Sequence, residues 1–188
     1  MTPTPNILVT NDDGINSRGI FRLWEAMEEI GNVTVVAPDT EKSAVGHAIT
    51  ISDPIRIQEF KQNGGIRGYS VDGTPADCVK IAITAICKNP PDIVISGINA
   101  GPNVGNNIIY SGTVSAATEG TMYNISSIAI SLASQKSQDF DFSTNIAQKV
   151  VKAVLKNGLP KGTLLNVNVP AIPQDKIKGI KITKQGHV

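Results

Sequence analysis

Short apolar runs alternate along the chain with segments in which apolar residues recur at helical spacing. Runs that are apolar throughout are typical of parallel strands covered on both faces, and a repeat of three to four residues is typical of amphipathic helices. The runs predict strands at 6–10, 33–37, 92–96, 128–132 and 164–169. The helical spacing predicts helices at 20–30, 74–86, 113–123 and 146–155. This order is typical of βα units wound on a parallel sheet, so the predicted class is α/β.

Residues 48–71 break this order, because apolar and polar residues alternate there around turn-forming glycine and proline residues. The alternation predicts a small antiparallel excursion from the main sheet. Its three alternating segments are 48–52, 55–60 and 66–71. A similar run, 177–183, lies near the end of the chain, and we expect it to belong to an arm that is completed by further chain or by a partner.

The helix that follows the excursion has a well-marked start. Thr74 is the predicted N-cap, Pro75 suits the first helical position, and Asp77 stands where a capping box places an acceptor. The sequence therefore fixes the beginning of this helix more closely than those of the others.

The composition limits the classes of protein that the chain can form. The chain has 188 residues, of which 40% are apolar and 18% charged, and this is typical of one globular domain over residues 1–188. The formal net charge is +1, whereas a surface for a nucleic-acid polymer needs a basic excess, so we expect no such partner. No apolar run reaches the length of a membrane span, and the first residues lack the pattern of a secretory signal. We therefore expect a cytoplasmic protein that does not contact membranes.

Polar residues follow the three best-defined strands, and parallel strands bring their carboxyl ends to one edge of the sheet. These segments are 11–14, 38–43 and 97–103. Asp12 and Asp13 are adjacent in the first of them, and two neighbouring carboxylates raise each other's pKa unless a cation lies between them. Carboxylate, hydroxyl and amide oxygens suit Mg²⁺, Mn²⁺ or Ca²⁺. The pattern indicates a metal site; a role as helix N-cap or turn residue would explain Asp12 alone, but not two carboxylates followed by Gly14.

Other sites of known spacing are not present. His47 and His187 are far apart, and neither Cys78 nor Cys87 has the spacing of a zinc ligand, so we expect no zinc site and assign His47 no role. The glycines of 97–105 match neither the dinucleotide fingerprint nor a P-loop.

Ser111, Gly112 and Thr113 stand just before a predicted helix. Hydroxyls and free amides at a helix N-terminus bind phosphate, and small residues leave room for it. Serine and threonine are also ordinary N-caps, so the residues alone support a phosphate site and a cap about equally.

At these residues the sequence resembles the survival protein SurE family of metal-dependent phosphatases that act on nucleoside monophosphates. The resemblance rests on long, ordered blocks spread over most of the first 120 residues. The blocks are ILVTNDDGINSRGI (7–20), VVAPDTEKSAVG (35–46), YSVDGTPADCV (69–79), PDIVISGINAGPNVG (91–105) and YSGTVSAATEG (110–120).

The resemblance implies a Rossmann-like three-layer α/β/α sandwich with a mainly parallel sheet, a small antiparallel extension, and assembly as a homodimer or homotetramer. Members usually continue past Val188, so it also implies that the arm used in oligomerisation lies outside this chain. The implied metal ligands for one divalent cation are Asp12, Asp13, Ser43 and Asn99. The implied phosphate-binding residues are Asn103, Ser111, Gly112 and Thr113.

The implied activity is that of a 5′-nucleotidase or acid-phosphatase-type hydrolase. It removes phosphate from nucleoside 5′-monophosphates, also from 3′-monophosphates, and in some members from short polyphosphate. Asp12 and Asp13 are the candidate catalytic residues, and the sequence does not separate direct attack by water from a role of one aspartate as base or nucleophile.

Three other classes share part of this pattern. A non-enzymatic receiver domain also binds Mg²⁺ with two acids after its first strand, but it needs an aspartate where Ser96 and Gly97 stand. A phosphatase with an aspartyl nucleophile needs one residue between its two acids, whereas Asp12 and Asp13 are adjacent. A dinucleotide oxidoreductase needs the missing glycine fingerprint.

Overall fold

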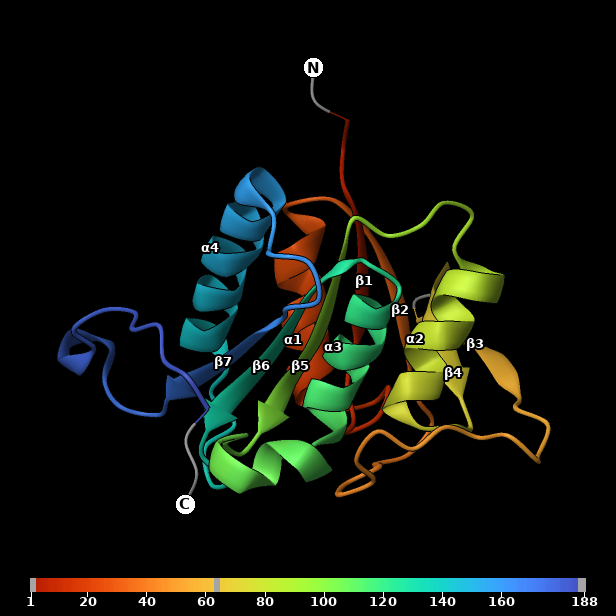
Figure 1. The fold of residues 1–188 in the computed structure, drawn as a ribbon, viewed down its shortest axis with the longest axis horizontal. Coiled ribbons are helices and arrows are strands. Elements are labelled where there is room, and N and C mark those ends of the chain that lie inside the picture. The colour runs from red at the N-terminus through yellow and green to blue at the C-terminus, as the bar shows by residue number, and fades with distance from the viewer. Residues whose placement is uncertain (1–2, 63–64, 186–188) are drawn as a thin grey trace.

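The computed structural model describes residues 3–62 and 65–185. Their seven strands form one sheet in the order β3-β4-β2-β1-β5-β6-β7 (Figure 1). The strands are β1 (Asn6–Thr10), β2 (Asn32–Pro38), β3 (Ile57–Gln62), β4 (Gly65–Val71), β5 (Ile93–Ala100), β6 (Ser126–Ala133) and β7 (Leu165–Pro170). Every neighbouring pair is parallel except β3 and β4, so the strands of the parallel part end at one edge.

Helices cover both faces of this sheet. They are α1 (Arg18–Glu28), α2 (Pro75–Ile81), α3 (Gly112–Met122) and α4 (Asp141–Asn157), with shorter turns η1 (Ala82–Ile86), η2 (Gly105–Tyr110) and η3 (Gln174–Lys176). The side chains of β1 alternate between two cores: Val9 packs with residues of α1 and α4, and Leu8 packs with residues of α2 and α3. The predicted α/β/α sandwich is confirmed.

The start of α2 forms as its sequence predicts. The Thr74 side chain accepts a hydrogen bond from the backbone N–H of Asp77, and the Asp77 carboxylate accepts one from the backbone N–H of Thr74. Pro75 occupies the first turn, where its missing N–H is not needed.

Helix α3 lies very close to the sheet because the side facing β5 and β6 carries small residues. A Cβ atom on Gly120 would come within 2.6 Å of the Ser127 Oγ atom and 2.8 Å of the Val94 Cγ2 atom. Ala116, one turn earlier, is fully buried in the same core. This close packing sets the N-terminus of α3 directly at the edge where β1 and β5 end.

The antiparallel extension differs in part from the prediction. Only β3 runs antiparallel, at the edge of the sheet, whereas β4 pairs in parallel with β2 and so belongs to the main sheet. The segment 48–52 is not a strand. Thr50 in this segment is engaged elsewhere: its backbone N–H and its hydroxyl both donate to the Asp77 carboxylate at the start of α2, and not to a neighbouring strand.

The alternating run 177–183 forms no strand in the part of the chain that the structure describes. Ile180 and Ile182 are exposed, Ile182 almost completely, Ile177 is half-buried, and none of the described strands pairs with the run. Alternation alone therefore did not produce a strand without a partner.

No helix among the described residues has both the length and the apolar character needed to cross a bilayer.

Replacement of Gly19 by alanine should destabilise the protein, although alanine is the better helix former. Gly19 is buried in the first turn of α1, and a Cβ atom there would lie on the carbonyl oxygen of Ile98 in β5. We expect the free energy of unfolding to fall by about 1–3 kcal/mol, as overpacking usually does. Urea denaturation measures this change. Gly65→Ala is the control, because a Cβ atom there meets open space, and it should change stability by less than about 0.5 kcal/mol.

Candidate active site

Asp12 follows β1 and lies against the N-terminus of α3. Its Oδ1 atom accepts a hydrogen bond from the Thr113 hydroxyl at 2.6 Å, between residues 101 positions apart. A Cβ atom on Gly112 would come within 2.7 Å of the Asp12 Cβ atom, so only glycine allows this approach without a shift of the chain. The structure thus joins a predicted metal ligand to the predicted phosphate-binding segment.

The turn that presents Asp12 and Asp13 is built by the residues on either side of them. The buried Asn11 donates through Nδ2 to the carbonyl of Gly14 and to the hydroxyl of Ser17, the N-cap of α1. Gly14 has a φ of 94°, a conformation that side chains with a Cβ atom rarely adopt. The two carboxylates therefore sit on a turn that is fixed at both ends.

Burial, together with repulsion from acidic neighbours, disfavours the charged forms of both aspartates. Burial raises the pKa of Asp13 to about 6, with Asp12 and then Glu41 adding to the rise, while a hydrogen bond from the backbone of Ala100 opposes it. Burial also raises the pKa of Asp12, against the opposing hydrogen bond from Thr113. No lysine or arginine among the described residues forms an ion pair with Asp12, Asp13 or Glu41.

Ser43 and Asn99 reach this edge from two other strand ends. The loop after β2 is tied to the turn by a hydrogen bond of 2.8 Å from the Lys42 N–H to the Asp12 carbonyl, and the Ser43 hydroxyl donates to the Glu41 carboxylate. Asn99 lies near the end of β5, next to the Ala100 backbone that contacts Asp13. Its Nδ2 atom donates to the Gly101 carbonyl at 2.8 Å, which leaves the amide oxygen, without a hydrogen-bond donor among the described residues, as the atom that could bind a cation.

The predicted phosphate-binding segment has the geometry of a helix N-terminus. Ser111 is the N-cap of α3, and its hydroxyl accepts a hydrogen bond from the Val114 N–H at 3.1 Å. The structure is compatible with both a helix cap and a phosphate site at this segment, because a capped helix still presents N–H groups in its first turn. Gly112 and Thr113 occupy that turn.

Asn103 supports this segment from within the protein. Its Nδ2 atom donates to the Ser131 Oγ atom at 2.9 Å and lies 3.5 Å from the Thr113 Oγ1 atom. Its backbone is held by the side chains of Asn166 and Asn168 on β7. Asn103 therefore sits next to the predicted phosphate site with its amide group engaged by protein atoms.

The donor set fits a hard divalent cation. Two carboxylates with raised pKa values and no basic partner leave a local excess of negative charge that a cation would neutralise. Among the described residues no three His, Cys, Asp or Glu side chains come together as a metal cage, so such a site depends on hydroxyl and amide oxygens as well. That mixture of oxygens is typical of Mg²⁺, Mn²⁺ and Ca²⁺ and unlike a zinc centre.

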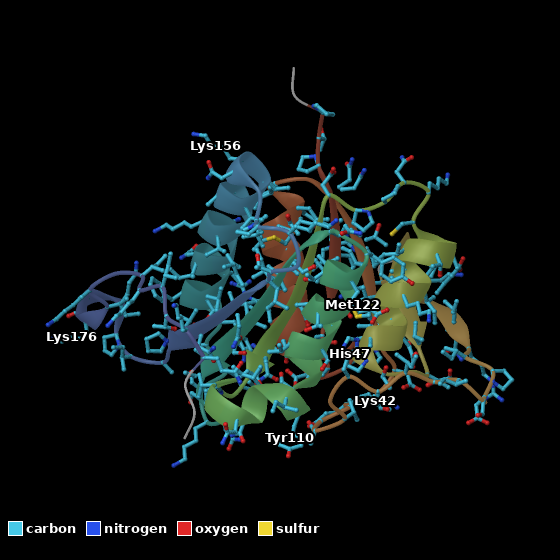
Figure 2. The ribbon with its side chains drawn as sticks, in the orientation of Figure 1. Lys42, His47, Tyr110, Met122, Lys156 and Lys176 are labelled. Atoms are coloured by element: carbon cyan, nitrogen blue, oxygen red, sulfur yellow. The ribbon has the colours of Figure 1, made fainter. Side chains whose placement is uncertain are left out.

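Two acidic residues near the site were given no role by the sequence. Glu41 lies close enough to act on the pKa of both aspartates. Glu119, in α3, is bonded to His47 at 2.7 Å, although the sequence gave that histidine no function. Glu119 stands among the small residues of the predicted helix, which could have marked it as a buried acid in need of a partner, but nothing in the sequence pairs it with His47. Figure 2 shows Lys42, His47 and Tyr110 at the same edge of the molecule.

Fold and site together define an α/β protein with an acidic, oxygen-rich site beside a helix N-terminus, an arrangement suited to chemistry on a phosphate ester. The family model "Survival protein SurE" matches residues 7–188. The chain belongs to the SurE family.

Relatives within the family are similar over nearly the whole chain. A protein of Syntrophobacter fumaroxidans named 5′-nucleotidase SurE is 53% identical over 182 residues, which cover 97% of this chain and 73% of the relative. A protein of Chlorobium chlorochromatii with the same name is 49% identical, over 97% of this chain and 67% of its own length. The crystal structure of the SurE protein from Aquifex aeolicus superposes with a TM-score of 0.90 at 45% identity, over 97% of this chain and 73% of that one.

Replacement of Asp13 by asparagine should stabilise the metal-free protein near neutral pH. The pKa of Asp13 is about 6 in the folded chain and about 3.9 in an unfolded one. Between these values the folded state keeps a proton that the unfolded state has lost, so the free energy of unfolding falls as the pH rises through this window. Asparagine carries no charge, and the variant should be about 1–2 kcal/mol more stable at neutral pH, after allowance for the part of the side chain that water screens.

Urea denaturation in EDTA from pH 4 to pH 8 measures this effect. Asp175→Asn is the control, because its side chain is highly exposed and far along the chain from the site; it should follow the wild type. An identical pH dependence in Asp13→Asn and the wild type would contradict the electrostatic description of the site.

Proposed function

We propose that the chain hydrolyses nucleoside 5′-monophosphates to a nucleoside and inorganic phosphate. One observation carries the proposal: the buried Asp12 carboxylate accepts a hydrogen bond from Thr113 in the first turn of α3. Residues suited to a cation and residues suited to a phosphate group therefore adjoin, as hydrolysis of a phosphomonoester requires. The shared name of the relatives, 5′-nucleotidase SurE, supports nucleoside monophosphates as the substrate class.

Asp12, Asp13, Ser43 and Asn99 are the proposed ligands of one divalent cation, with Mg²⁺ and Mn²⁺ as first candidates and Ca²⁺ as the third. Such an ion, when bound, polarises a phosphoryl oxygen and makes a coordinated water more acidic. The two aspartates would supply the negative charge that balances the cation, Ser43 a hydroxyl oxygen and Asn99 an amide oxygen. Because these four residues are widely separated in sequence, the site requires that β1, β2 and β5 are assembled side by side.

The start of α3 is the proposed phosphate site. The N–H groups of Gly112 and Thr113 and the hydroxyl group of Ser111 would bind phosphoryl oxygens and stabilise negative charge as it develops, while the Thr113 hydroxyl keeps its hydrogen bond to Asp12. Asn103 orients Thr113 through its contacts with that hydroxyl and with Ser131. These groups are fixed before a substrate arrives, so little reorganisation accompanies the reaction.

Direct attack by water is the proposed chemical step. The water oxygen forms a bond to phosphorus, the ester bond to the nucleoside oxygen breaks, and the leaving oxygen takes a proton. No cysteine or histidine among the proposed site residues could act as a nucleophile, and the nearby His47 is engaged by Glu119. Asp12 and Asp13 are the candidate catalytic groups, and an aspartyl intermediate is the alternative that trapping of a phosphoenzyme would reveal.

Further activities and assembly follow the family resemblance. We propose that 3′-monophosphates and short polyphosphate are secondary substrates, and that the active form is a homodimer or homotetramer in the cytoplasm. Nucleic-acid polymers and membranes are not among the proposed partners.

Asp12→Asn should abolish phosphate release and leave the fold intact. The amide keeps the size of the side chain and can still contact Thr113, but it removes the negative charge that the cation needs. We expect kcat/KM to fall at least about 100-fold. The assay is phosphate release from a panel of nucleoside 5′- and 3′-monophosphates with Mg²⁺, with Mn²⁺ and without metal.

The matched control is Asp53→Asn, the same substitution in an exposed loop outside the site, which should retain full activity. Circular dichroism should be the same for both variants and the wild type. Hydrolysis by Asp12→Asn at the wild-type rate would remove Asp12 from the mechanism, and an inert wild type under every metal condition would contradict the proposed activity.

A further inference from the structure

The loop that carries Ser43 is anchored to α3 by one pair of side chains. The His47 Nε2 atom lies 2.7 Å from the Glu119 Oε2 atom, and the Glu119 side chain is only 9% exposed. Glu119 is in the last two turns of α3, whereas Ser111, Gly112 and Thr113 are at its start. The pair therefore connects the loop after β2 to the body of the helix whose N-terminus faces the proposed phosphate site.

Glu119 has a strong need for this partner. A carboxylate that is nearly buried is unfavourable unless it is hydrogen-bonded or paired with a charge. The neighbouring residues on the buried side of α3 are small or apolar, such as Ala116 and Gly120. The position of His47, and with it the position of the loop, is thus tied to the solvation of a buried acid.

Two backbone contacts just before His47, one on each side of Ser43, tie this part of the loop to the site. The Lys42 N–H donates to the Asp12 carbonyl at 2.8 Å, and the Gly46 N–H donates to the Tyr110 carbonyl at 3.0 Å, next to Ser111. Ser43 lies between these two contacts but is itself exposed, and the structure shows only the neighbouring Glu41 as a side-chain partner for its hydroxyl. Its distance from Asp12 and Asp13 therefore depends on how firmly the rest of the loop is held.

We propose that His47, through Glu119, is a positioning residue that holds Ser43 in place for cation binding. This inference rests on the proposed function, because it concerns the proposed ligand Ser43. His47 does not touch the substrate or the cation in this role. It acts by keeping the loop closed over the N-terminal end of α3.

Replacement of His47 tests the role directly. His47→Ala removes the anchor, and we expect Mn²⁺ to bind at least about tenfold more weakly, as when other residues that orient metal ligands are replaced. His47→Gln is the conservative variant, because its amide nitrogen can still donate to Glu119, and it should recover most of the affinity. Glu119→Ala should match His47→Ala, and the double variant should be no worse than either single variant, since both remove the same contact.

The measurements are Mn²⁺ affinity by electron paramagnetic resonance, kcat and KM for a nucleoside 5′-monophosphate, and the melting temperature. Met122→Ala is the control on the same helix, because Met122 is exposed and should leave all three unchanged (Figure 2). A lower melting temperature with wild-type Mn²⁺ affinity in both His47→Ala and Glu119→Ala would show a purely structural pair and overturn the inference alone. A wild-type protein that neither binds Mn²⁺ nor releases phosphate would overturn the proposed function and this inference together.

Discussion

Two neighbouring carboxylates at the end of β1 dominate the electrostatics of this structure. Burial and proximity raise the pKa values of Asp12 and Asp13, and Glu41 adds further negative charge. Folding gathers these groups although their mutual repulsion opposes it, so the rest of the structure must hold them there. Asn11 and Gly14 fix the turn, Thr113 and the Ala100 backbone donate hydrogen bonds, and glycine at 112 lets α3 approach. The carboxylates are electrostatically unfavourable together, but hydrogen bonds and backbone packing hold them in place; such perturbed pKa values are typical of functional sites.

The same support explains why the parallel sheet matters more to function than any single motif. Asp12 and the loop with Ser43 follow β1 and β2, Asn99 lies near the end of β5, and these three strands are neighbours that end at one edge of the sheet. The small residues of α3 then allow its first turn to lie against that edge. The relative positions of the site residues therefore depend on how the strands and α3 pack together.

Much of this arrangement could be predicted from the sequence, because the signals were local. Apolar runs identified the strands of the parallel core, Thr74, Pro75 and Asp77 marked the start of α2, and topology alone predicted that the polar strand ends converge. The segment 48–52 was predicted wrongly, since its alternation could not reveal that Thr50 is bonded to Asp77. The His47–Glu119 contact was also invisible, because it joins residues 72 positions apart and neither has a distinctive neighbourhood. Sequence periodicity reports which face of an element is buried, but not which distant polar group it meets.

The hydrogen bond between Asp12 and Thr113 spans 101 positions, and this separation has a consequence for how the protein assembles. Contacts between residues so far apart form only after the intervening chain has been organised, because closing a long loop is entropically unfavourable until other contacts compensate. Here the intervening chain includes β2, the extension, α2 and β5. A cation that binds only at this assembled centre would favour the native state over partly folded forms, and its stabilisation of the fold would grow with the logarithm of its concentration above Kd. Binding of the proposed cation would thereby be coupled to completion of the fold.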